Sequence, residues 1–101
     1  MSLIKFSLEI RNAQTHFVVL REVVEGATQF FVAFANTRIR DCFNMQRKDN
    51  IWHFLPPSDD EIVFSILLDS TFTINSSFFQ CFFEKNEMDK IGKEILRHVE
   101  L

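Results

Sequence analysis

The stretch QFFVAFAN, residues 29–36, has the composition of a β-strand and sets the first constraint on the fold. Side chains in a strand alternate between two faces, and here both faces are apolar. Phe30, Val32 and Phe34 share one face, whereas Phe31 and Ala33 share the other. One face must belong to the core. The second face is then either covered by another part of the chain or exposed for a partner.

Four neighbouring segments also have the pattern of strands. Residues 3–11, LIKFSLEIR, alternate between apolar and polar side chains, as a half-buried strand does. Similar runs occupy residues 15–24, 38–46 and 51–55, and short turn-like breaks separate all of these segments. Short breaks favour antiparallel hairpins, so the sequence predicts a five-strand antiparallel meander.

Turn chemistry predicts the register of this meander. We place two-residue turns at 25–26, 36–37 and 48–49, and a wider turn across residues 12–15. All the predicted partners then fall on one face, which we call the core face. The expected pairs are Ile10–Phe17, Leu8–Val19, Phe17–Phe34, Val19–Val32, Phe34–Ile39, Phe30–Phe43, Phe43–Phe54 and Met45–Trp52.

Two charged residues, Arg21 and Asp41, interrupt the core face. They fall two strands apart, so a structural ion pair is the simpler expectation, because buried charges are usually paired. Snorkelling at the sheet edge is a second reading of the same two residues, and a charged site inside a ligand cavity is a third.

There are two candidate binding surfaces, one on the opposite face, which we call the outer face, and one along the fourth strand and its turn. The first is an apolar centre within a polar rim, the composition of an interaction site. We call it the outer patch, and it comprises Val18, Leu20, Phe31 and Ala33. The second is a basic strip that would contact an acidic partner or keep the strand soluble. It comprises Arg38, Arg40, Arg47 and Lys48.

The second half of the chain is less regular. SDDE, residues 58–61, has the form of a capping box and allows a helix over about 59–69. The β-branched and aromatic residues that follow favour about three strands over 62–84 instead, and these could fold over the outer face. A C-terminal amphipathic helix is expected after Asn86, with Met88, Ile91, Ile95 and Val99 in one stripe. Gly92 inside it suggests close packing against the sheet.

The whole chain, residues 1–101, is therefore expected to be one α+β domain: a meander of about five strands, about three further strands and one C-terminal helix. This layout resembles the pleckstrin-homology-like superfold, which implies a bent barrel closed at one end by the helix. The segment between the first two strands, RNAQTH at 11–16, is not the basic loop of phosphoinositide binders. We therefore expect no phosphoinositide or membrane binding.

Composition and motifs narrow the function further. The net charge of −3 argues against nucleic-acid partners. The N-terminus lacks a signal-peptide pattern and no run approaches the length of a membrane span, which together with two expected free thiols, Cys42 and Cys81, predicts a cytoplasmic protein. His16, His53 and His98 show no metal-ligand spacing with the cysteines. Neither a nucleophile elbow nor a phosphate-binding loop occurs, so we expect no catalysis and no cofactor.

We therefore expect a non-enzymatic interaction module that binds a protein partner, or a second copy of itself, through the outer patch. The alternative is a small-ligand or lipid-binding barrel, with phenylalanines lining a cavity and Arg21 and Asp41 supplying polar contacts.

Overall fold

The computed structural model describes residues 3–37, 40–61 and 83–99. The elements are β1 (Leu3–Ile10), β2 (Ala13–Val24), β3 (Ala27–Ala35), β4 (Arg40–Lys48), β5 (Ile51–Leu55) and the helix α2 (Lys85–Val99). The strands form one antiparallel sheet in the order β1-β2-β3-β4-β5. The five-strand meander and the C-terminal helix are thus confirmed. The further strands expected over 62–84 lie outside the described residues, except for Phe83 and Glu84, which are not in a strand.

Three two-residue turns join the hairpins, at 11–12, 25–26 and 49–50, and all six residues have positive φ. This left-handed pair is the conformation whose twist matches that of the flanking strands. The predicted turn at 25–26 is confirmed. The turns predicted across 12–15 and at 48–49 are wrong because the pairs that end in Asn12 and Asn50 take the left-handed conformation instead. The β3–β4 connection spans residues 36–39 and is wider than predicted.

The predicted pairings that differ from the structure are all shifted by an even number of residues. The pairs Phe17–Phe34 and Val19–Val32 are confirmed. Val19 faces Ile4 instead of Leu8, a shift of four residues, and Phe43 faces Val32 instead of Phe30, a shift of two. The β4–β5 pairing is also shifted by two. An even shift leaves every side chain on its original face, so the predicted core face is still correct.

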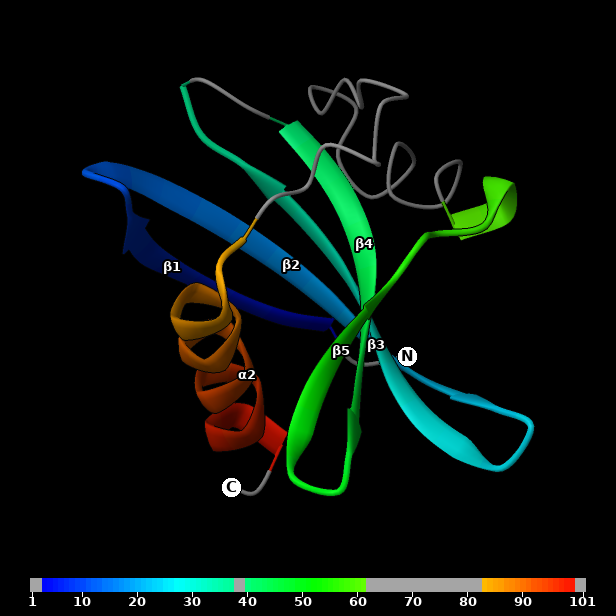
Figure 1. Cartoon of the computed structure of the whole chain (residues 1–101). Coiled ribbons are helices and arrows are strands. Elements are labelled where there is room, and N and C mark those ends of the chain that lie inside the picture. Colours follow the sequence, from blue (N-terminus) through cyan, green and yellow to red (C-terminus); the bar gives the residue numbers. More distant parts are fainter. Residues whose placement is uncertain (1–2, 38–39, 62–82, 100–101) are drawn as a thin grey trace.

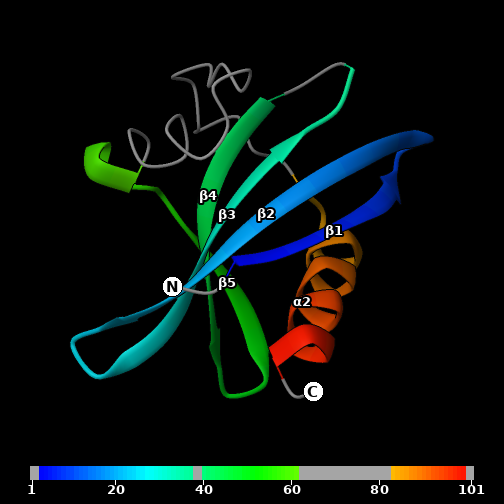
Figure 2. The same ribbon diagram turned by 180° about the vertical axis from the view of Figure 1, so that it is seen from behind.

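The core lies between this face and α2, which both ribbon views place beside β1 and the β4–β5 hairpin (Figures 1 and 2). Ile91 and Ile95 of the helix are fully buried there. Phe83, just before α2, packs its ring against four phenylalanine rings of the sheet, with centroids 4.9–6.4 Å apart. These rings belong to Phe17, Phe34, Phe43 and Phe54.

The helix begins earlier than predicted. The main-chain N–H of Met88 donates to the carbonyl of Glu84, and the N–H of Glu84 donates to the Glu87 carboxylate at 2.9 Å. Glu84 therefore stands at the cap position, and Asn86, the predicted cap, lies within the first turn. Glu87 also accepts two hydrogen bonds from Arg11, at 2.8 and 3.0 Å, which tie the β1–β2 turn to the start of the helix.

Gly92 packs directly against the Trp52 ring, as its position in the helix suggests. A Cβ atom at this position would lie 2.3 Å from two atoms of the indole. Only a residue without a side chain allows the helix and β5 to approach this closely. Within the described ranges, no helix is both long and apolar enough to span a membrane.

Candidate functional site

A groove runs between α2 and the β4–β5 hairpin, which lie side by side in both ribbon views (Figures 1 and 2). Its cavity volume is about 590 Å³, which is within the range of small binding sites. We call it the helix–hairpin groove. It is lined by Arg47, Asn50, Trp52, Asp89, Lys93, Leu96 and Arg97.

Helical spacing builds one wall of this groove. Asp89, Lys93 and Arg97 follow one another at intervals of four residues, so they form a single polar stripe on α2. The other wall comes from the hairpin, where Arg47 and Trp52 face each other across β4 and β5. Gly92 keeps the two walls together because it brings the helix backbone onto the Trp52 ring.

The groove is basic with an apolar part. Three of its lining residues are cations and one is an acid, and Trp52 and Leu96 supply apolar surface. Arg97 donates a 3.1 Å hydrogen bond to Glu94, which offsets part of its charge. In the described part of the chain, Arg47 and Lys93 have no ion pair within 4.0 Å. An exposed cation beside an apolar wall suits a ligand that carries both an acidic group and an apolar group.

The predicted basic strip is divided by the fold. Arg38 lies outside the described residues. Arg40 and Arg47 lie at opposite ends of β4 and, seven positions apart, on opposite faces. Of the strip residues that the structure describes, only Arg47 lines the groove, and Lys48 is exposed at the end of β4. The other charged groove residues were not singled out from the sequence, although the spacing of 89, 93 and 97 was a readable signal.

The outer patch is covered at its centre. Phe31 is 1% exposed and Ala33 is 4% exposed, and with fully buried Cys42 they form a second apolar cluster. Val18 and Leu20 are half-buried. The second apolar face of the 29–36 strand is therefore buried where its largest side chain lies, and Phe31 is not available as a free surface.

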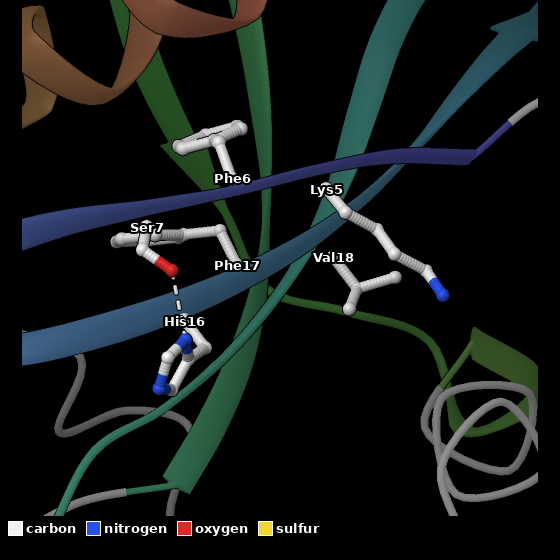
Figure 3. A pocket seen from close by; sticks show the side chains of 6 residues that line it. All are labelled: Lys5, Phe6, Ser7, His16, Phe17 and Val18. Carbon is white, nitrogen blue, oxygen red and sulfur yellow. Dashed lines mark hydrogen bonds between the residues drawn. The ribbon is translucent and has the colours of Figure 1, made fainter.

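A second, smaller pocket of about 310 Å³ lies on β1 and β2 and is lined by six residues (Figure 3). In it Ser7 Oγ and His16 Nδ1 are 2.8 Å apart, and Figure 3 shows the two side chains pointing toward each other. A serine–histidine pair can be a nucleophile and its base. Here both residues are directly opposed in the β1–β2 ladder. We interpret the pair as a cross-strand hydrogen bond.

Arg21 and Asp41 do not come together. Arg21 is exposed and faces Phe30, which faces Met45 of β4. Asp41 lies four residues from Met45 along β4, roughly 13 Å by strand rise. Asp41 is 2% exposed and accepts a 2.8 Å hydrogen bond from the N–H of Cys42, and its burial raises the pKa of its carboxyl group above the usual value.

Among the residues that the structure describes, no group of three or more His, Cys, Asp or Glu side chains could hold a metal ion. No protein family, curated protein or solved structure matches this chain.

Proposed function

We propose that the protein is a non-enzymatic interaction module and that the helix–hairpin groove binds an acidic segment of a protein partner. One observation carries the proposal: three cations surround an apolar wall in a cavity of about 590 Å³. The free, buried thiol of Cys42 suits the reducing cytoplasm in which we place the protein.

The proposed surface differs from the outer patch because Phe31 and Ala33 are buried. A partner that docks on the outer patch would need this face to be uncovered first. The alternative, a pleckstrin-homology-like barrel that holds a lipid or small ligand, has weaker support. The phenylalanine rings that would line its cavity pack against one another and against Phe83 instead.

The single tryptophan of the chain makes the groove testable by fluorescence, because Trp52 is part of its lining. The probe is a twelve-residue peptide of alternating Glu and Leu, and the matched control peptide has Lys in place of Glu. We expect the acidic peptide to shift Trp52 emission and to bind with a dissociation constant in the micromolar range. Binding should weaken as salt is raised from low to physiological concentration, because the exposed charges become screened.

Charge reversal identifies the surface. Lys93→Glu should weaken binding of the acidic peptide by at least tenfold, which corresponds to 1.4 kcal/mol. Lys5→Glu is the control, since Lys5 is exposed on β1 and lies outside the groove. Equal losses in the two variants would show that the peptide senses only net charge. Tight binding with no change in Trp52 emission would place the site elsewhere.

A further inference from the structure

The β2–β3 hairpin extends beyond the rest of the sheet as a two-stranded arm. We call residues 21–29 the β2–β3 arm. Within the described ranges, the pairing of β2 with β1 ends at Leu20 and the pairing of β3 with β4 ends at Phe30. Past these residues the two strands pair only with each other, up to the turn at Glu25 and Gly26. Two strands alone enclose no core, so an apolar side chain on the arm is buried only by something outside it.

The arm carries exposed apolar side chains on both of its faces. Val23 is 68% exposed and Val24 is 45% exposed. Neighbouring residues of a strand point to opposite faces, so each face of the arm presents one valine. Glu25 is exposed at the turn, whereas Glu22 is half-buried and accepts a 3.4 Å hydrogen bond from Gln29. The end of the arm is therefore apolar on two sides and acidic at its apex.

The helix–hairpin groove has the complementary arrangement. Each of its two walls supplies one apolar side chain, Leu96 from α2 and Trp52 from the β4–β5 hairpin. Each wall also supplies an exposed cation, Lys93 from the helix and Arg47 from the hairpin. A segment that enters between the walls meets apolar surface and positive charge on both sides. The end of the β2–β3 arm, with a valine on each face and an acid at its apex, fits this description.

The arm and the groove carry opposite net charges. The arm has one cation and two acids: Arg21, Glu22 and Glu25. The groove has three cations and one acid, Asp89, and it remains positive by one charge when Glu94, the partner of Arg97, is also counted. Lys48 and Asp49, at the turn of the β4–β5 hairpin, carry opposite charges and cancel. Complementary charge of this kind orients one surface against another.

The arm does not meet the groove of its own chain. In both ribbon views the arm and α2 lie on opposite sides of the β4–β5 hairpin (Figures 1 and 2). The groove opens on the other side of that hairpin, toward α2. Only a second molecule can therefore bring the end of an arm into the groove.

We propose that the end of the β2–β3 arm of one copy docks into the helix–hairpin groove of a second copy. This inference rests on the proposed function of the groove and names its partner, since the acidic and apolar segment is EVVEG, residues 22–26 of this chain. One valine lies against each apolar wall, and Glu25 meets the cations of the groove. The two contacting surfaces differ, so the contact is heterologous and every copy offers one arm and one groove.

A complementation experiment tests this contact. The arm variant combines Val23→Ser with Val24→Ser, and the groove variant is Lys93→Glu. The contact is small, so we expect the parent to associate weakly, with a mass by light scattering that rises above that of one chain as its concentration increases. Each variant alone should need at least a tenfold higher concentration to associate. A mixture of the two should form a heterodimer, because the intact arm of the groove variant still fits the intact groove of the arm variant.

Leu55→Ser is the matched control for the arm variant, because Leu55 is an exposed apolar residue of β5 outside the groove lining. Lys5→Glu is again the control for charge reversal. Both controls should associate like the parent, and the melting temperature of every variant verifies that it is folded. A parent that stays monomeric at all concentrations would overturn the inference. A mixture without heterodimer would also overturn it, as would association of Lys93→Glu equal to that of the parent, which would indicate contact between two arms.

The peptide of alternating Glu and Leu separates this inference from the proposed function on which it rests. We expect the arm variant to bind the peptide at least as tightly as the parent does, because no second copy competes for its groove. Peptide binding together with a monomeric parent would keep the groove as a binding site and exclude only the second copy as its partner. If the peptide binds neither the parent nor the arm variant, both proposals are wrong.

Discussion

Gly92→Ala tests whether the contact between α2 and β5 is as close as the structure shows. The added Cβ would lie 2.3 Å from Cε2 and Nε1 of Trp52 and 2.8 Å from Cζ2. Ordinary contacts between carbon atoms are roughly 3.5–4.0 Å, so the ring or the helix must move by more than about 1 Å. Overpacking of this kind costs about 1–3 kcal/mol. Alanine regains up to about 1 kcal/mol of helix propensity.

With the full gain in helix propensity, the expected net effect is a loss of up to about 2 kcal/mol in the free energy of unfolding. For a chain of this size each kcal/mol lowers the melting temperature by roughly 4–8 °C. Urea titration followed by circular dichroism measures the loss, and a double-mutant cycle with Trp52→Leu locates its origin. Leucine lacks all three clashing ring atoms, so Gly92→Ala should be neutral or stabilising in that background. Stabilisation by Gly92→Ala in the parent chain would refute the close contact.

Three further predictions follow from buried groups and from the tie between sheet and helix. Phe31→Glu should lower the free energy of unfolding by more than about 3 kcal/mol and abolish the folded signal in circular dichroism, because it buries a charge. A stable, folded variant would mean that Phe31 is accessible. Thr15→Val should lower the free energy of unfolding, measured by urea titration, by about 1–2 kcal/mol. The reason is that the buried Thr15 hydroxyl donates a 3.2 Å hydrogen bond to a carbonyl and accepts a 3.1 Å hydrogen bond from Asn36. An unchanged urea midpoint would contradict these hydrogen bonds. Burial raises the pKa of Glu87, but the hydrogen bonds from Arg11 and from a main-chain N–H lower it by more, so the pKa lies below its usual value of 4.5. The folding stability that ionised Glu87 contributes is therefore present above pH 4.5 and is lost in acid. Arg11→Ala should therefore cost below about 1 kcal/mol at pH 7 and nothing near pH 2; a difference that persists in acid would point to lost packing instead.

The sequence predicts faces better than turns in this protein. Alternation along a strand depends only on the pleat, so the core face could be assigned before any contact was known. Turn positions depend on which residues accept positive φ. Arg11 and Asp49 do so here in turns without the glycine that would have revealed them. Because each resulting slip was even, an error in register left the core assignment intact.

The candidate site was only partly predictable. The groove exists because a helix near the C-terminus packs against the β4–β5 hairpin, and no local pattern specifies that packing. The stripe of Asp89, Lys93 and Arg97 could be predicted from its spacing along the sequence. The position of Trp52 next to this stripe could not. Likewise SDDE revealed the capping role of Glu61, whereas the hydrogen bond of Glu61 to Asn44 depends on tertiary structure.

The placement of Ile91 and Ile95 in the sheet's core has a consequence during synthesis. β-hairpins form in about 1–10 μs, so the meander can assemble soon after Leu55 leaves the ribosome. Translation proceeds at about 5–20 residues per second, and α2 ends 44 residues later (99 − 55), so its arrival takes roughly 2–9 s. Throughout that interval the newly made sheet exposes its phenylalanine face. The nascent chain therefore has a window in which a chaperone or another nascent chain can occupy the place of the helix.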